Sequence, residues 1–276
     1  MSEETTAEWS GPGIDNSTPS VARVYNAILG GRDNFKADRE AAEYVSRLVP
    51  QVEQCAQANR CALIRGVQYL VRRAGIDQIL DIGCGLPSEP NTHEVAREIN
   101  PDARVVYVDN DPMVLSHGRA LLDTDNATTV VTADLRDPEG ILGHADVRAF
   151  LDLDRPVAVV IVGTIMQINE HEHPDEIIAA LMEPLPSGSH LFLTAWPDTG
   201  EAAQRQLSQA CLETFGNGWI RPVERLREHF GELDMVPPGL EYVARWFPED
   251  PDAPVPAVAD LEPHQHTQMA GIAKKP

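Results

Sequence analysis

The sequence is poor in basic residues and has no long apolar run. Its 276 residues include 22 Lys and Arg against 43 Asp and Glu, which gives a formal net charge of −21. A field of this sign repels a phosphate backbone, so we expect no nucleic-acid substrate. No apolar stretch approaches the length of a membrane-spanning helix. We therefore also expect no membrane partner and a soluble, cytoplasmic protein.

Cysteine is scarce as well, and no metal-binding spacing stands out. None of the four cysteines forms the close pair of a zinc or redox motif: Cys55, Cys61, Cys84 and Cys211. His171 and His173 flank Glu172 in a predicted loop, but no third ligand follows at a telling spacing. We therefore predict solvated loop residues there, no metal site and no disulfide.

The N-terminal quarter of the chain predicts helices. Residues 1–18 are polar and predict a disordered leader. Helical patterning then runs from Ser20 to Leu29, from about Asp38 to Leu48 and from about Val52 to Arg73. We expect residues 19–75 to form a helical cap over the carboxyl edge of a sheet, which is where open α/β folds bind ligands.

Residues 76–276 predict an α/β domain. The pattern predicts strands near 78–82, 104–109, 128–132, 157–163 and 189–195, separated by helices near 89–99, 112–122, 137–150 and 174–183. Such alternation is typical of parallel strands joined by right-handed crossovers. Two more helices are expected near 200–214 and 221–230. Extended segments near 241–247 and 268–274 then predict a final antiparallel hairpin.

The strongest motif lies where the predicted strands end. The first strand stops at Gly83-Cys84-Gly85, the second ends at Asp109, and the third leads to Asp134. Glycine permits close approach of the backbone to a ligand, and an acid at the next strand end can accept ribose hydroxyls. Asp134 could accept from an adenine amine while the Leu135 amide donates to a ring nitrogen. The three strand ends thus predict a site for a nucleotide-like ligand.

These strand ends resemble the class I S-adenosylmethionine-dependent methyltransferases. The resemblance implies a Rossmann-like α/β fold, with a seven-stranded, mostly parallel sheet and a C-terminal antiparallel hairpin. It also implies S-adenosyl-L-methionine as cofactor. By this resemblance the methionine end of the cofactor lies at Gly83 and Gly85, with its ammonium oriented by Asp81. The ribose lies at Asp109, with Asn110 and Met113 beside the adenosine, and the adenine lies at Asp134 and Leu135.

A closer resemblance rests on motifs spread along the chain, among them Ala22-Arg23-Val24-Tyr25, Leu29-Gly30-Gly31-Arg32-Asp33-Asn34-Phe35 and Val106-Tyr107-Val108-Asp109-Asn110-Asp111-Pro112. They are similar to a bacterial family of S-adenosylmethionine methyltransferases whose substrate is unassigned. Tyr25, Gly31 and Asp33 are candidates to close over the cofactor, and Tyr25 or Arg23 could meet the methionine carboxylate. The alternative is a helix-turn-helix that only packs on the sheet.

The expected function is methyl transfer from S-adenosylmethionine to an unidentified small-molecule acceptor. No catalytic residue follows from the sequence; the candidates are His93, Asp33 and the residues flanking Gln167. One alternative is a non-catalytic protein that binds S-adenosylmethionine. The other is an NAD-dependent oxidoreductase, because the spacing from Gly85 to Asp109 suits either cofactor. Leu86-Pro87-Ser88 replaces the usual third glycine and weakens the dinucleotide interpretation.

Overall fold

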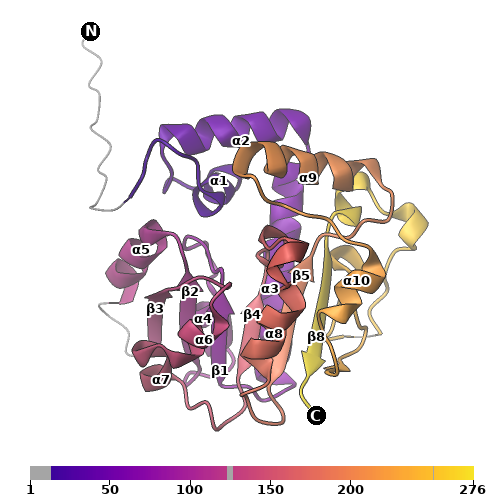
Figure 1. Cartoon of the computed structure of the whole chain (residues 1–276). Helices are drawn as coiled ribbons and strands as arrows, with labels where there is room; N and C mark the ends of the chain where they lie inside the picture. The colour runs from indigo at the N-terminus through magenta and orange to yellow at the C-terminus, as the bar shows by residue number, and fades with distance from the viewer. Residues whose placement is uncertain (1–13, 123–126, 251) are drawn as a thin grey trace.

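A central sheet organises the protein in the computed structural model, which describes residues 14–122, 127–250 and 252–276. Five strands are parallel: β1 (Gln78–Ile82), β2 (Arg104–Asp109), β3 (Thr128–Thr132), β4 (Ala158–Ile161) and β5 (His190–Ala195). The strand β8 (Met269–Lys274) pairs antiparallel with β5, and the short strands β6 (Asp234–Met235) and β7 (Glu241–Tyr242) both pair with β8. The order is β3-β2-β1-β4-β5-β8-β6, so the carboxyl ends of β1 to β5 share one edge (Figure 1).

Helices cover both faces of this sheet. Successive residues of a strand point to opposite faces, and both faces here are apolar, so each needs a covering layer. Leu80 of β1 and Val159 of β4 face one core, which also includes residues of α6 (Pro138–Gly143), α7 (Ala145–Phe150), α8 (Pro174–Met182) and α10 (Val223–Glu228). Ile79 and Val160, the adjoining residues, face the other core, which includes α4 (Thr92–Arg97) and the C-terminal half of α3 (Val52–Arg72). Strands buried on both faces read as continuous apolar runs, as the sequence does here.

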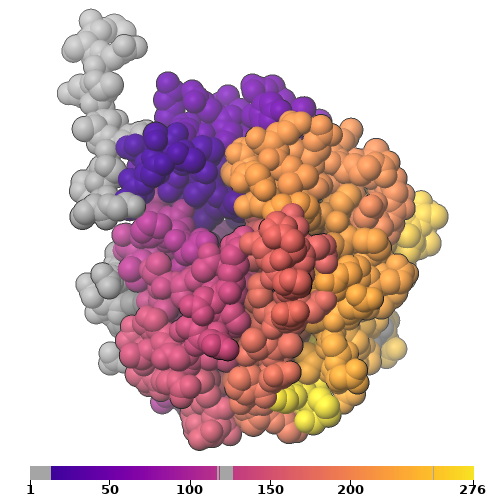
Figure 2. Space-filling model, viewed as in Figure 1, coloured from indigo at the N-terminus to yellow at the C-terminus, as the bar shows by residue number. Residues whose placement is uncertain are grey.

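The N-terminal helices lie above the carboxyl edge of the sheet. The helices α1 (Val21–Ile28) and α2 (Lys36–Leu48) sit over the strand ends, beside α9 (Ala202–Phe215) (Figure 1). Val45 of α2 and Leu207 of α9 share one apolar cluster. In the space-filling view, the indigo atoms of the first helices and the orange atoms that include α9 adjoin above the strand region (Figure 2). The helix α5 (Pro112–Leu122) follows β2 at the same edge.

Only part of the predicted leader lies within the described residues, and the predicted domain division is not tested. Residues 1–13 of the predicted leader lie outside the described residues, and residues 14–18 form neither helix nor strand. The predicted cap of 19–75 comprises α1, α2 and α3, but the C-terminal half of α3 packs in the core of the sheet. The division at residue 76 stays a prediction. Across the described ranges, no helix combines the length and apolar character needed to cross a membrane.

The mostly parallel sheet with an antiparallel end is confirmed, but within the described residues the sheet has eight strands where seven were predicted. Both β6 and β7 are two residues long, too short to leave an alternating pattern in the sequence. The segment predicted as extended over 241–247 leaves the sheet after Tyr242 and turns through a 3₁₀ helix, Val243–Arg245. This turn carries Trp246 into the core, where its ring stacks on Phe192 with centroids 5.3 Å apart.

The helix predicted over 137–150 is interrupted at His144, which ends α6 and begins α7. Its backbone is extended, and its ring nitrogen Nδ1 accepts from the amide of Asp146 at 3.2 Å. The helix predicted from residue 89 begins instead at Thr92, because Asn91 is the N-cap and Glu94 completes a capping box. The sequence thus predicts the ends of β1, β2, β3 and α5 correctly, but it misses β6 and the break at His144.

Candidate active site

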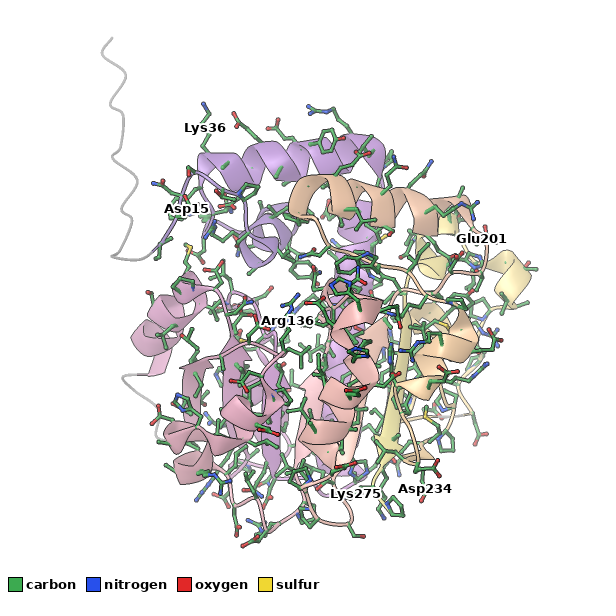
Figure 3. The ribbon with its side chains drawn as sticks, in the orientation of Figure 1. Asp15, Lys36, Arg136, Glu201, Asp234 and Lys275 are labelled. Carbon is green, nitrogen blue, oxygen red and sulfur yellow. The ribbon has the colours of Figure 1, made fainter. Side chains whose placement is uncertain are left out.

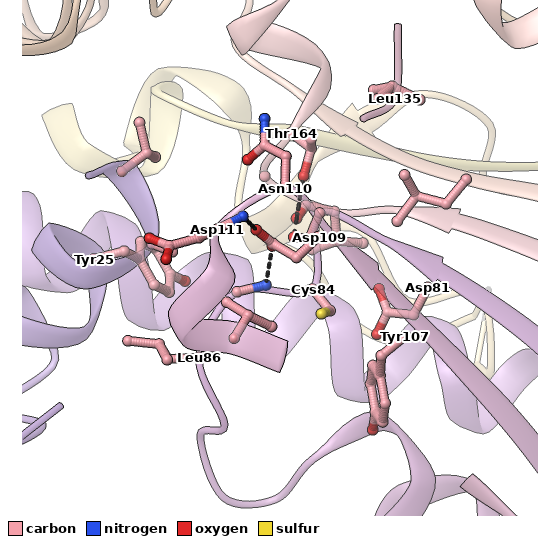
Figure 4. Close-up of a pocket in the computed structure, with 18 of the residues that line it drawn as sticks. Tyr25, Asp81, Cys84, Leu86, Tyr107, Asp109, Asn110, Asp111, Leu135 and Thr164 are labelled. Carbon is pink, nitrogen blue, oxygen red and sulfur yellow. Dashed lines mark hydrogen bonds between the residues drawn. The ribbon is translucent and has the colours of Figure 1, made fainter. Parts of the chain in front are cut away.

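A cavity of about 270 Å³ opens at the carboxyl ends of the parallel strands, beneath the cap helices. Eight of the residues predicted for the cofactor site line it: Tyr25, Asp81, Gly83, Gly85, Asp109, Asn110, Asp134 and Leu135. Figure 4 shows Asp109 in the middle of this site, with Tyr25 on one side and Asp81 and Tyr107 on the other. The size approaches the usual range for small-molecule pockets.

Two glycines shape the loop after β1 in different ways. Both Gly83 (φ +72°) and Gly85 (φ +67°) adopt left-handed backbone conformations, which favour glycine. A β-carbon on Gly83 would overlap the side chain of Thr164, which follows β4. At Gly85 a β-carbon would meet nothing within 4 Å. Packing therefore requires the first glycine, whereas the second keeps a part of the cavity open for a ligand.

Asp109 is tied to the glycine loop by its own carboxylate. Oδ2 accepts from the Gly85 amide at 2.8 Å, and Oδ1 accepts from the Asp111 amide at 2.9 Å. Burial raises the pKa of Asp109, although these amides act in the opposite direction. Each oxygen keeps a lone pair for a further donor. The carboxylate is thus held facing the cavity and can accept from two neighbouring hydroxyl groups.

Asp81, at the end of β1, is a second buried carboxylate in the cavity. Burial raises its pKa to about 6, while the Thr92 hydroxyl and the positive charge of Arg60 act to lower it. The Thr92 hydroxyl donates to Oδ2 at 2.6 Å. An acid with this pKa is largely ionised at neutral pH, and a positively charged ligand group would lower its pKa further.

Asp134 and Arg136, beyond β3, form a charged pair at the cavity wall. Asn110 donates to Asp134 at 3.0 Å, and the Arg136 guanidinium lies 3.2 Å from the same carboxylate. Burial acts to raise the pKa of Asp134, but the Arg136 amide, Asn110 and the guanidinium together lower it. Arg136 also pairs with Glu172 and donates to the carbonyl of Gln167. It lies between the strand ends and the cap helices (Figure 3).

The helix α3 contributes a positively charged residue to the cavity, beside the loop after β1. Arg60 lines the cavity and donates to the carbonyls of Ser88 and Pro90 in the loop after β1. Tyr25 also lines the cavity, but its hydroxyl donates to the Ala56 carbonyl at 2.9 Å and accepts from Asn59. Arg60 is therefore better suited than Tyr25 to hold a ligand carboxylate. No sequence pattern distinguishes Arg60 from the other charged residues of this helix, Glu53, Arg65 and Arg72.

Several other predicted residues lie away from the cavity lining. Gly31 packs against Asn26, whose side chain occupies the space of a β-carbon there, and the Asp33 amide donates to Asn26 Oδ1 at 3.1 Å. Met113 packs in an apolar cluster with Phe35. Arg23 is buried and pairs with Asp38 at 2.9 Å. Gly31 and Asp33 thus contact Asn26 within the cap, and their role at the cofactor stays a prediction.

His93 lines the cavity and contacts Tyr107. Its backbone amide donates to the Tyr107 hydroxyl at 2.9 Å, and its ring nitrogen Nδ1 lies 2.9 Å from the same oxygen. The hydroxyl accepts from the amide and can donate to Nδ1. Among the described residues no group of three potential ligands is placed to hold a metal ion.

The strand order, the antiparallel C-terminal strands and this cavity define a Rossmann-like methyltransferase fold. The family described as S-adenosyl methyltransferase matches residues 7–276, and the chain therefore belongs to this family of S-adenosylmethionine-dependent enzymes. No curated protein sequence matches the chain.

Solved structures agree with this assignment. A crystal structure from Thermobifida fusca YX, provisionally described as a methyltransferase, is 48% identical with a TM-score of 0.91 and covers 98% of this chain and 99% of its own. A DUF574 family protein from Streptomyces avermitilis is 35% identical with a TM-score of 0.86, over 95% and 99% of the two chains. Human N-acetylserotonin methyltransferase, solved with S-adenosylmethionine, shares the fold at 12% identity and a TM-score of 0.51, over 94% and 63%.

Proposed function

We propose that this enzyme transfers the methyl group of S-adenosylmethionine to a small-molecule acceptor, with the cofactor lying across the ends of β1, β2 and β3. The observation that carries the proposal is the buried carboxylate of Asp109, fixed by the Gly85 and Asp111 amides at the cavity. Its free lone pairs suit the two hydroxyls of a ribose. The open space at Gly85 supports a ligand close to the backbone.

The remaining lining residues suit the other parts of the cofactor. We assign the adenine to Asp134 and Leu135, with Asn110 beside it, because all three line the cavity at the β2 and β3 ends. We assign the methionine ammonium to Asp81 and the methionine carboxylate to Arg60, two groups of opposite charge on the β1 side. The bound cofactor supplies an electrophilic methyl group on its sulfonium.

The acceptor proposed here is a small molecule. The cavity continues from the β1 end to the β4 end, where Gly163, Thr164 and Gln167 line it. That continuation supports an enzyme over a protein that only binds the cofactor. The net charge of −21 supports a small molecule over nucleic acid. Transfer requires an electron-rich atom about 3 Å from the methyl carbon, so catalysis rests mainly on positioning.

Titration calorimetry with S-adenosylhomocysteine and NAD tests the cofactor assignment. We expect S-adenosylhomocysteine to bind and NAD not to bind. Asp109→Asn should weaken binding, and Asp102→Asn is the matched control because Asp102 is exposed and lies before β2, at the other end of the strand. Tight binding of NAD without binding of S-adenosylhomocysteine would contradict the proposal.

A further inference from the structure

Asp134, beyond the end of β3, has a carboxylate whose acceptor positions are all taken. Oδ1 accepts from the Arg136 amide at 2.9 Å and from the Arg136 guanidinium at 3.2 Å. Oδ2 accepts from Asn110 at 3.0 Å and from the same guanidinium nitrogen, Nη1, at 3.4 Å. A carboxylate offers about four lone-pair positions. A further donor, such as the amino group of a ligand, therefore has to displace one of these partners.

The guanidinium of Arg136 is the partner that is free to leave. Its distances to the carboxylate are the longest of the set, and the Arg136 amide still holds Asp134 through a local turn of the backbone. The other guanidinium nitrogens have acceptors of their own, because Nε donates to Glu172 and Nη2 donates to the Gln167 carbonyl at 3.2 Å. The guanidinium can therefore release Asp134 and keep an acid as its partner.

Arg136 also lies where the cavity meets solvent. Among the described residues that line the cavity, only Asn110 and Arg136 are exposed. The side chain of Arg136 is 41% exposed and that of Asp134 is 37% exposed. Figure 3 shows Arg136 at this place, between the strand ends and the cap helices. A ligand that enters from solvent therefore reaches Asp134 beside the guanidinium.

We propose that Arg136 blocks the adenine end of the cavity in the ligand-free enzyme, and that it must leave Asp134 for the adenine amine of the cofactor to bind there. This step rests on the proposed function. The guanidinium and the amine both present N–H donors to one carboxylate, so they compete for it. The contact is thus autoinhibitory. It lowers the affinity for S-adenosylhomocysteine, the product whose release completes a turnover.

Glu172 gives the displaced guanidinium a second position at the rim of the cavity. It ends the 3₁₀ helix Glu170–Glu172, and its Oε2 accepts from the Asn169 amide at 2.6 Å, which leaves Oε1 for Arg136. A glutamine has one oxygen for these two donors. Glu172→Gln therefore removes the second position and leaves Asp134 and Arg136 in place, so that the guanidinium loses more when it gives up Asp134.

Titration calorimetry with two ligands tests the inference: S-adenosylhomocysteine, and its analogue with purine in place of adenine. The analogue lacks the amine and has no donor for Asp134 at that position. Arg136→Met removes the competing guanidinium, so S-adenosylhomocysteine should bind about three- to fivefold more tightly, as the strength of an exposed ion pair predicts. The purine analogue should gain nothing, so the preference for adenine should rise by the same factor. Glu172→Gln should weaken S-adenosylhomocysteine binding about twofold.

The matched control is Arg148→Met, because Arg148 is exposed on α7 and does not line the cavity. It should leave both affinities unchanged, and urea unfolding should show that all the variants are folded. No gain for S-adenosylhomocysteine in Arg136→Met, or an equal gain for both ligands, would overturn the inference. A gain in Glu172→Gln as large as that in Arg136→Met would also overturn it, because the guanidinium would then act only as a bridge between two loops.

Two other results would be directed at the proposed function instead. Failure of the wild-type protein to bind S-adenosylhomocysteine would overturn the choice of cofactor. Equal wild-type affinities for S-adenosylhomocysteine and the purine analogue would overturn the placement of adenine at Asp134.

Discussion

The two walls of the cavity are built in different ways. On the wall formed by the ends of β1, β2 and β3, polar groups partner the backbone nearby, as Asp109 does with Gly85 and Asp111. The other wall includes Gln167, after β4, and Asn217, after α9, which are far apart in the chain. Each of them has a buried amide oxygen without a hydrogen-bond partner. The first wall is therefore held together by local contacts and suits the proposed cofactor, whereas the second depends on tertiary contacts.

Removal of the buried ion pairs of Arg23, which join the cap to the strand ends, should have the largest effect on stability. Arg23 of α1 pairs with Asp38 at 2.9 Å and with Asp111 at 3.4 Å, and all three side chains are buried. Replacing Arg23 by Met leaves two buried carboxylates without their cation. We expect a loss of about 3–5 kcal/mol in the free energy of unfolding, measured with urea.

The exposed Arg32→Met is the control and should change little. Adding Asp38→Asn to Arg23→Met should recover part of the loss, because it removes one of the unpaired charges. If Arg23→Met were as stable as Arg32→Met, the ion pairs of Arg23 would contribute nothing to holding the cap on the strand ends.

Alanine substitutions at Gly83 and Gly85 should affect stability and cofactor binding to different extents. Gly83→Ala combines left-handed strain with overlap of Thr164, so we expect about 3 kcal/mol less stability. Gly85→Ala has the strain but no overlap within the protein, and should cost about 1 kcal/mol. Its β-carbon enters the cavity, however, and should weaken S-adenosylhomocysteine binding strongly.

Urea unfolding and titration calorimetry on the same two variants provide both readouts. Thr164→Ala should restore part of the stability lost in Gly83→Ala, because it removes the two nearest overlapping atoms, Oγ1 and Cγ2, and should do nothing for Gly85→Ala. Equal stability losses in the two glycine variants would show that backbone strain alone matters at this loop.

The two walls should also differ in what they bind. Asp109→Asn removes the charged acceptor proposed for the ribose, and hydrogen bonds to a charged group contribute about 1.5–3 kcal/mol each. We expect affinity for S-adenosylhomocysteine to fall about 100-fold by calorimetry, whereas Asn217→Leu leaves it unchanged. A large loss in Asn217→Leu would mean that the second wall also binds the cofactor.

The same contrast explains what the sequence could predict. Gly83, Asp109 and Asp134 follow predictable strands, and parallel strands bring their ends to one edge, so local patterns were enough to place them together. The position of Asn217 depends on how the loop after α9 docks on the segment after β4, a contact between residues over fifty positions apart. The need for glycine at position 31 comes from the adjacent Asn26 side chain, which the sequence pattern does not reveal, and its contact with the cofactor stays a prediction.

Asp81 provides a test of smaller effect, in which binding and stability change in opposite directions. Burial raises its pKa to about 6 from the usual 3.8, so the ligand-free folded protein holds this proton more tightly than the unfolded chain does. This contribution favours folding below about pH 4 and is lost as the pH rises through about 6. Asp81→Asn, which can still accept from Thr92, should therefore be more stable at pH 7.5, by on the order of 2 kcal/mol.

Affinity for the cofactor should instead increase with pH, because the methionine ammonium needs the ionised carboxylate of Asp81. Affinity of the wild-type protein for S-adenosylhomocysteine should be highest above pH 7 and should fall as the pH drops through about 6. Asp81→Asn should bind more weakly at pH 7.5 and depend less on pH. Part of the dependence should remain, since burial also raises the pKa of Asp109. A variant that is neither more stable nor weaker in binding would place Asp81 outside the cofactor site.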